Sequence, residues 1–338
     1  MRPVVFVAPF PLETTLRFAR AAARLGGVTL LGVVQEPPKG PDHGVFRELV
    51  TVKDAAALPV ARHALLTSRA EATACARAVG FPMVLKPPAG MGAKATFRVR
   101  GEGELFGALE GMRASAGAPV LAEELLVGEE GSFDTVTIGG APRVASISHY
   151  LPTPLTVLEN PWIQWCCVLP RDVRGPAYDA VRAVGVAAIR ALGLRDGITH
   201  MEWFRRPDGS VVIGEIAQRP PGANITRMIG LAYDVDPYRA WARAVIDGAI
   251  DGEWERRHAV GCAFFRGMGR GRVSGVDGVH ETHVAIGRLV EEVKLPTLGA
   301  PKSDSYEGDG YVIVRHERTE VVQGALQYAI EHVRVRYA

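Results

Sequence analysis

Apolar positions along the chain follow two spacings, one typical of strands and the other typical of helices. Residues 4–8 (VVFVA) and 28–34 (VTLLGVV) are short β-branched runs, and residues 13–25 between them place apolar side chains at helical spacing. A strand, a helix and a second strand in this order predict a parallel βαβ unit. A turn-rich stretch at 35–44 then leads to one more strand near 49–53.

From residue 59 the pattern changes and predicts a small α+β unit with antiparallel strands, followed by hairpins and helices. Ser68 is the predicted N-cap of the first of these helices and Gly80 its end. The predicted helices are 68–80, 102–115, 176–192, 237–248 and 319–333; the predicted strands and hairpins are 81–87, 95–100, 119–126, 132–149, 198–217, 259–265, 284–290 and 311–315. His280 and His283, just before the strand predicted at 284–290, have a spacing that could suit a metal. In a strand-like region their rings would point to opposite sides, so we expect a polar surface pair rather than a metal site.

The hairpin predicted over residues 198–217 brings two acidic side chains together. A two-residue turn at its Asp-Gly pair would place Glu202 opposite Glu215 and His200 opposite Ala217. Two carboxylates directly opposite each other repel, so such a pair persists only if one is protonated or if a cation lies between them. Oxygen ligands of this kind suit Mg²⁺, and the spacing therefore predicts a metal site.

The turn of this hairpin allows a second register. Asp208 and Gly209 are a strong signal for a two-residue turn, but Pro207 favours a type I turn with a bulge at Gly209. That turn would shift the register by one residue. Glu202 and Glu215 would then be solvated side chains on opposite faces of the hairpin.

Three basic side chains and a glycine-rich loop are candidates for contacts with phosphate. Arg219 lies four residues beyond the second glutamate and could stabilise a phosphoryl or oxyanion charge, or it could simply pair with a carboxylate. Lys86 ends an apolar run just before Gly90 and Gly92, whose backbone could approach phosphate oxygens; a Gly-rich hairpin beside a surface lysine is the alternative. Lys94, at the far end of the loop, is either a second phosphate contact or a solvated side chain.

Composition narrows the classes of function. The 338 residues include 39 Lys and Arg and 37 Asp and Glu, for a net charge of +2, which provides no strong field for binding nucleic acid or an acidic membrane. The four cysteines have no CxxC spacing, so we expect buried thiols in a reducing cytoplasm. No run of about 18 apolar residues predicts a membrane span. No GxGxxG follows the first strand, which argues against a nicotinamide dinucleotide site.

Five segments in order resemble the ATP-grasp superfamily of carboxylate ligases, in its biotin-carboxylase-like branch. They are VGFPMVLKPPAGMGAKATFRV, VLAEELLVGEEGSFD, GITHMEWF, GEIAQRPPGANI and SYEGDGYVIV. The resemblance implies an α/β and α+β fold in which two α+β subdomains grip ATP, preceded by a short parallel βαβ unit. It implies a truncated N-terminal domain at 1–57, a small ATP-binding subdomain at 58–126 and a large subdomain with the metal site at 127–338.

The resemblance also implies a role for individual residues around ATP and Mg²⁺. Lys86 would contact the nucleotide phosphates under a flexible cover from Gly90 through Gly92 to Lys94. The backbone of Glu124 and Leu126 would bind the adenine edge, with Glu123 beside the base and Glu130 on the ribose hydroxyls. Glu202 and Glu215 would bind Mg²⁺, Arg219 would neutralise an acyl-phosphate, and His200 would border the reaction centre.

Members of this superfamily transfer the γ-phosphate of ATP to a carboxylate, and an amine then attacks the acyl-phosphate. The resemblance therefore implies an ADP-forming ligase for a small carboxylic acid and an amine; a non-catalytic ATP-binding module descended from such a ligase is the alternative. Ala217 stands where the family has an asparagine that binds the metal. Three alternatives follow: the two carboxylates bind the metal together with water and phosphate, Asn224 reaches the metal instead, or activity is reduced. The short sheet at 1–57 has edges that need cover, and we expect it to pack on the C-terminal lobe or on a second copy in a homodimer.

Overall fold

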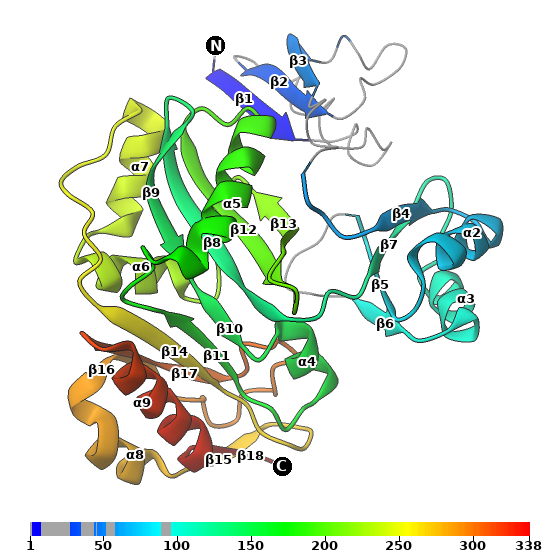
Figure 1. Cartoon of the computed structure of the whole chain (residues 1–338). Coiled ribbons are helices and arrows are strands. Elements are labelled where there is room, and N and C mark those ends of the chain that lie inside the picture. The colour runs from blue at the N-terminus through cyan, green and yellow to red at the C-terminus, as the bar shows by residue number, and fades with distance from the viewer. Residues whose placement is uncertain (1, 8–27, 35–43, 45, 52–57, 89–95) are drawn as a thin grey trace. The chain divides into compact units, whose positions relative to one another are not determined.

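The structure is a computed structural model, and it describes residues 2–7, 28–34, 44, 46–51, 58–88 and 96–338 (Figure 1). The chain divides into two compact units. The first contains the described residues up to Leu125 together with Ala183–Arg195, and the second contains Leu126–Arg182 and Asp196–Ala338.

A parallel sheet forms from the described strands of residues 1–57. Its order is β1 (Arg2–Val7), β2 (Val28–Val34) and β3 (Glu48–Thr51), and both pairs of neighbours are parallel. The predicted parallel arrangement is confirmed, while the helix predicted at 13–25 lies outside the described residues.

The second sheet of the first unit has four antiparallel strands, as predicted. Their order is β4 (His63–Leu66), β7 (Val120–Glu124), β5 (Met83–Lys86) and β6 (Phe97–Val99), and the accompanying helices are α2 (Arg69–Val79) and α3 (Glu102–Gly111). Helix α2 begins and ends as predicted: the Ser68 side chain accepts a hydrogen bond from the Glu71 N–H, and Gly80 ends the helix with φ 81°. The core of this sheet includes the fully buried Leu66, Met83, Leu85 and Leu105.

The described residues after 125 form a nine-stranded sheet and most of the helices. The strands are β8 (Glu129–Ile138), β9 (Ala141–Ile147), β10 (His149–Leu151), β11 (Trp165–Leu169), β12 (Gly197–Arg205), β13 (Val211–Ala217), β14 (Ala259–Phe265), β16 (Val290–Lys294) and β17 (Gly310–His316). Their order is β13-β12-β8-β10-β11-β14-β17-β16, with β9 paired to β8. Strands β15 (Val273–Asp277) and β18 (Arg334–Tyr337) form a separate pair; the helices are α4 (Pro154–Glu159), α5 (Asp179–Ala191), α6 (Ile225–Tyr233), α7 (Pro237–Asp247), α8 (Val279–Ile286) and α9 (Thr319–His332).

The two faces of this large sheet bury different cores. Helix α6 packs against β11 and β14 on one face, and α9 packs against β14 and β17 on the other (Figure 1). Neighbouring residues of one strand therefore belong to different cores: Cys167 and Cys262 lie under α6, whereas Cys166 lies on the side of α9. The alternation of side chains along a strand produces this division.

All four cysteines are in described segments, and each is a buried free thiol, as predicted. Burial raises the pKa of Cys166 to about 12 and raises the pKa values of Cys75, Cys167 and Cys262 as well. These thiols therefore stay protonated, and we assign them to packing.

The strand predicted at 284–290 is wrong. Helix α8 and a 3₁₀ turn at Gly287–Leu289 occupy most of it, and β16 begins at Val290. The buried residues of α8 are Thr282 and Ile286, four apart, which is a helical rather than a strand period. His280 and His283 are thus on a helix, and both are exposed, so the predicted surface location holds although its strand geometry does not.

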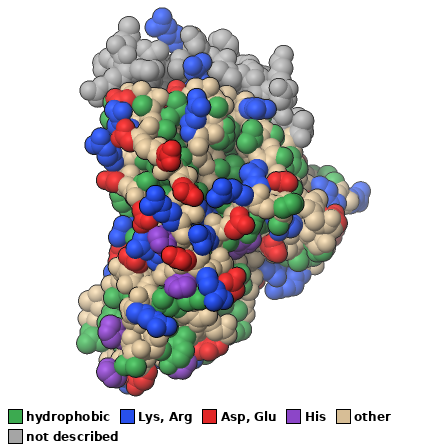
Figure 2. All heavy atoms as spheres, turned by 60° about the vertical axis from the view of Figure 1, so that its left-hand side comes forward, with side chains coloured by type: hydrophobic (Ala, Val, Ile, Leu, Met, Phe, Trp, Pro, Cys, Tyr) green, Lys and Arg blue, Asp and Glu red, His purple; other side chains and the backbone are tan. Residues whose placement is uncertain are grey.

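Charged side chains of both signs are interspersed over the face seen in Figure 2, in keeping with the small net charge. Among the helices that the structure describes, none combines the length and the apolar character needed to cross a membrane.

We expect Gly131→Ala to lower the free energy of unfolding by about 2 kcal/mol. A Cβ at this position of β8 would collide with the Ser148 carbonyl oxygen and approach the buried Trp203 ring, so backbone would have to move. Urea unfolding measures the change. Gly324→Ala, in the interior of α9, is the matched control, because a Cβ there meets nothing within 4 Å and the helix should gain up to about 1 kcal/mol. Equal stability of the two variants would contradict this account.

Candidate functional site

The two glutamates of the second hairpin face each other across β12 and β13. Glu202 is the register partner of Glu215, and His200 is the partner of Ala217, as the sequence predicts. Strands β12 and β8 are also paired in register, so the side chains opposite His200 and Glu202 on β8 share the same face.

The hairpin reaches this register by a different route from the predicted two-residue turn. At the tip the Arg206 N–H donates to the Ser210 carbonyl, and Gly209 has φ 85° and donates to the Arg206 carbonyl. This is the three-residue turn that Pro207 favours, with the glycine in the left-handed region. The prediction of a two-residue turn at Asp208 and Gly209 is therefore wrong.

A bulge between the tip and the site compensates for that difference. Trp203 pairs with Ile213, whereas Glu202 pairs with Glu215, so Gly214 is an extra residue on β13. A Cβ on Gly214 would come within 2.8 Å of the Phe204 ring, which explains why the smallest residue occupies the bulge. The bulge returns Glu202 and Glu215 to direct opposition.

A third carboxylate, Glu130 on β8, lies on the same face. It is 6% exposed, and its register partners are Phe204 on β12 and Tyr150 on β10. Burial, together with the negative charges of Glu202 and Glu215, raises the pKa of Glu130 well above its usual value. Mutually repelling carboxylates of this kind are stabilised by a cation, and all-oxygen donors suit Mg²⁺.

These side chains fit a metal only with additional ligands. Throughout the part of the chain that the structure describes, no group of three or more Asp, Glu, His or Cys side chains is arranged to hold a metal ion. Mg²⁺ often uses one or two carboxylates and takes its remaining oxygens from phosphate and water. The opposed pair therefore suits a metal that arrives with a phosphate ligand.

His200 joins this face to the interior of the sheet. It is 4% exposed; its Nδ1 lies 2.7 Å from Oδ1 of Asp134, and its Nε2 lies 3.8 Å from Oε1 of Glu202. Burial alone would lower the pKa of His200, but the Asp134 carboxylate and, to a smaller extent, Glu202 raise it to about 10. At neutral pH the ring is therefore an imidazolium between two acidic side chains.

Arg219 and Asn224 follow β13, and the structure places them differently. Arg219 Nη2 lies 3.8 Å from Glu215 Oε1, so the arginine is beside the acidic pair, with its side chain 38% exposed. Asn224 turns its amide to the Cys262 thiol, 3.9 Å away. Ala223 and Asn224 both have positive φ, 50° and 60°, which costs about 1–3 kcal/mol each and is common beside functional sites.

The candidates in the first unit form their own ion pairs. Lys86 Nζ lies 2.6 Å from Glu123 Oε2, with both side chains largely buried. The Glu124 carboxylate binds Arg62, and its backbone N–H donates to the Arg62 carbonyl, so a backbone contact from Glu124 to a base would have to use its carbonyl. Leu126 begins the second unit. Gly90, Gly92 and Lys94 lie outside the described residues.

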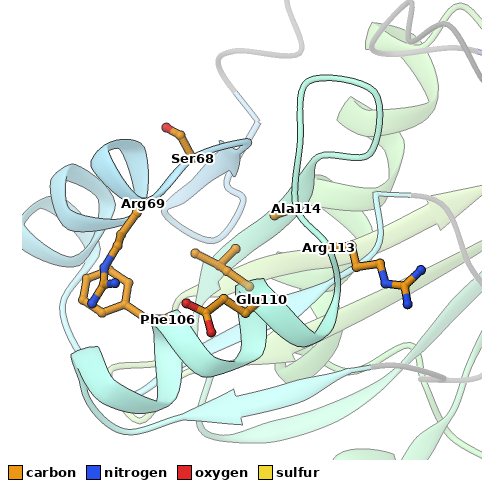
Figure 3. Close-up of a pocket in the computed structure, with 7 residues that line it drawn as sticks. Ser68, Arg69, Phe106, Glu110, Arg113 and Ala114 are labelled. Atoms are coloured by element: carbon orange, nitrogen blue, oxygen red, sulfur yellow. The ribbon is translucent and has the colours of Figure 1, made fainter.

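Neither of two cavities in the described residues includes the acidic pair in its lining. The first, about 150 Å³, lies between α2 and α3, where Arg69 stacks over Phe106 at 4.1 Å (Figure 3), and it includes none of the predicted site residues. The second, about 30 Å³, lies under the start of α7 and includes Asp134 and Ser146 in a mostly apolar lining. A space of this size holds water rather than a substrate.

Sequence reasoning missed Asp134, Ser132 and Ser148. The hydroxyls of Ser132 and Ser148 are 2.6 Å apart, and Ser132 donates to Asp134 at 2.6 Å, in the interior of the sheet. The signal was available, since polar residues 130, 132 and 134 recur with the period of a strand and share a face with His200.

Comparisons with known proteins agree with this architecture. No family model matches the sequence. The chain is 27% identical over 183 residues to the L-arginine-specific L-amino acid ligase of Bacillus subtilis, a match that covers 53% of this chain and 43% of that protein. The chain thus matches less than half the length of this curated relative.

Solved structures match over the whole chain at low sequence identity. The L-amino acid ligase from Bacillus licheniformis has a TM-score of 0.69 at 14% identity, covering 100% of this chain and 99% of that one. The N5-carboxyaminoimidazole ribonucleotide synthetase from Thermotoga maritima has a TM-score of 0.59 at 15% identity, covering 100% of both chains. The synthase from Aspergillus clavatus, bound to ADP and 5-aminoimidazole ribonucleotide, has a TM-score of 0.60 at 15% identity, covering 98% of both. At these identities the likeness establishes a common fold.

Proposed function

Because the chain has the ATP-grasp fold, as its sequence predicts, we propose that it is an ATP-dependent ligase. It would transfer the γ-phosphate of ATP to a small carboxylic acid, and an amine would attack the resulting acyl-phosphate, releasing ADP and phosphate. The observation that carries the proposal is the opposed pair Glu202 and Glu215, with the buried Glu130 on the same face. Carboxylates crowded in this way weaken a fold and are retained where they bind a cation.

Glu202 and Glu215 would hold Mg²⁺, with phosphate and water oxygens completing its ligands. The bound ion would offset the charge of the phosphates, which is what phosphoryl transfer chiefly requires. Arg219, beside Glu215, would bind the oxygens of the transferred phosphoryl group and neutralise the acyl-phosphate. His200, held by Asp134, borders the same centre and keeps a positive charge next to Glu202.

We propose nucleotide contacts for eight further residues. Lys86 would bind phosphate oxygens, and its ion pair with Glu123 holds the ammonium in position. Gly90, Gly92 and Lys94 would cover the phosphates, and Glu123, Glu124 and Leu126 would surround the adenine. The Glu130 carboxylate would accept hydrogen bonds from the ribose hydroxyls.

We propose that an amino acid supplies the carboxylate, the amine or both. One line of support is the sequence match to a protein named as an L-amino acid ligase. The other is the fold that this chain shares with a second protein named as an L-amino acid ligase. The buried free thiols suit a reducing compartment, and we place the protein in the cytoplasm. A second copy of the chain, in a homodimer, would cover the edges of the β1–β2–β3 sheet.

The test is release of ADP. Protein incubated with Mg²⁺, ATP and pooled L-amino acids should form ADP, and mass spectrometry should detect a dipeptide that withdrawal of single amino acids then identifies. Omission of the pool should stop ADP release. Binding of ATP without turnover across a broad pool of acids and amines would favour the non-catalytic module, and absence of ATP binding would exclude both functions.

A further inference from the structure

Five side chains form a polar chain that leads from the interior of the large sheet to the acidic pair. Ser148 Oγ lies 2.6 Å from Ser132 Oγ, which lies 2.6 Å from Asp134 Oδ2. Asp134 Oδ1 lies 2.7 Å from His200 Nδ1, and His200 Nε2 lies 3.8 Å from Glu202 Oε1. The first four residues are at most 4% exposed, whereas the Glu202 side chain, at 29%, is open to solvent.

Strand register sets the direction of this chain. Asp134 is the partner of His200 and Ser132 is the partner of Glu202, so the four side chains share one face of β8 and β12. An ionised carboxylate only accepts hydrogen bonds, so Ser132 and the Nδ1–H of His200 both donate to Asp134. With Nδ1 held in this way, the ring has one orientation, and its Nε2 edge faces Glu202.

We propose that Asp134 is a positioning residue that fixes His200 against Glu202 and so holds the Glu202 carboxylate in place for Mg²⁺ carried by the nucleotide. The inference rests on the proposed function, since it assigns a supporting partner to the proposed metal site. Partners that orient metal-binding side chains typically contribute 10- to 100-fold to metal affinity. Asp134 is 3% exposed and its carboxylate contacts His200, so its proposed effect on the metal is exerted through His200 rather than by direct contact with substrate.

A second buried pair on the same two strands provides a control that distinguishes the positioning role from simple stabilisation of the sheet. The hydroxyls of Thr135 and Thr199 are 2.6 Å apart. Thr135 directly follows Asp134 in the sequence, and Thr199 directly precedes His200. Their side chains therefore lie on the opposite face and lead to neither glutamate. Thr199→Val removes this hydrogen bond at nearly constant volume and is the matched control.

The experiment measures how much Mg²⁺ strengthens ADP binding. Calorimetry gives the dissociation constant of ADP with Mg²⁺ and with EDTA, and the ratio of the two constants is the contribution of the metal. We expect Asp134→Ala to reduce this ratio by about 10- to 100-fold while leaving binding in EDTA unchanged. Asp134→Asn keeps an oxygen acceptor for His200 and should retain the ratio, as should Thr199→Val.

Each other outcome counts against the inference or against the proposed function. A full ratio in Asp134→Ala, an equal loss in Thr199→Val, or an equal loss in Asp134→Asn would overturn the positioning role. If Mg²⁺ fails to strengthen ADP binding by the unmodified protein, the proposed metal site itself fails. Should Asp134→Ala not fold, Ser132→Ala removes one of the two hydrogen bonds on Asp134, and we expect about a fivefold smaller ratio; no change would overturn the inference.

Discussion

Replacement of Glu215 by Gln is expected to reduce ADP release by about a thousandfold and to leave the protein at least as stable as before. The substitution removes one of two opposed carboxylates, so the proposed Mg²⁺ loses a ligand, and the side-chain volume hardly changes. It also removes the repulsion between Glu202 and Glu215 and part of the charge acting on Glu130, which should favour folding. A coupled ADP assay measures the rate, and urea unfolding in EDTA measures the stability.

The combination of lost turnover and preserved stability is what marks a functional carboxylate. Glu129→Gln is the matched control: this glutamate is next to Glu130 on β8, but it is largely exposed and pairs with Arg205 at 2.7 Å. Its activity should stay within about twofold of the parent. Turnover within tenfold of the parent in Glu215→Gln would remove the metal role from this pair.

Replacement of Arg219 by Met is expected to reduce turnover by about a thousandfold, with a small effect on the KM for ATP. Arg219 is 38% exposed and its nearest carboxylate, on Glu215, is 3.8 Å away, so neither burial nor a short ion pair gives it a large part in stability. Its planar guanidinium suits two phosphoryl oxygens, whereas a lysine would offer one flexible charge. Steady-state kinetics separates kcat from KM, and Arg219→Lys should remain severely impaired.

Arg227→Met provides the comparison for Arg219→Met. Arg227, on α6, is exposed to a similar degree and pairs with Glu292 at 3.2 Å, away from the acidic pair. Loss of this ion pair should change stability by less than about 1 kcal/mol and leave kcat unchanged. If both arginine variants lose turnover equally, Arg219 has no special part in the chemistry.

The opposition of the two glutamates could be predicted from the sequence, but the path of the hairpin could not. Local preferences at Pro207, Asp208 and Gly209 supported two turns, and the three-residue turn formed. The bulge at Gly214 depends on how the Phe204 ring packs against β13, which is tertiary information. The register at the site was therefore predicted correctly from an incorrect turn.

Helix α8 is an element whose type was predicted wrongly from the sequence. A strand was predicted over 284–290, but Val284 is 73% exposed and only Thr282 and Ile286, four positions apart, are buried in this helix. In so short a segment the two periods fit almost equally well, and packing against α9 decides between them. The polar chain through Asp134 was missed because charged residues are mostly exposed to solvent, and Asp134 was therefore not expected in the interior. Its burial becomes understandable once it is known to pair with His200.

Burial of every native thiol has a practical use. A single cysteine introduced on an exposed site will be the only one that a maleimide dye reaches quickly, because Cys75, Cys166, Cys167 and Cys262 are enclosed and protonated. Fluorophores could thus be attached to each unit without first deleting native cysteines, and energy transfer between them would report whether nucleotide changes their separation.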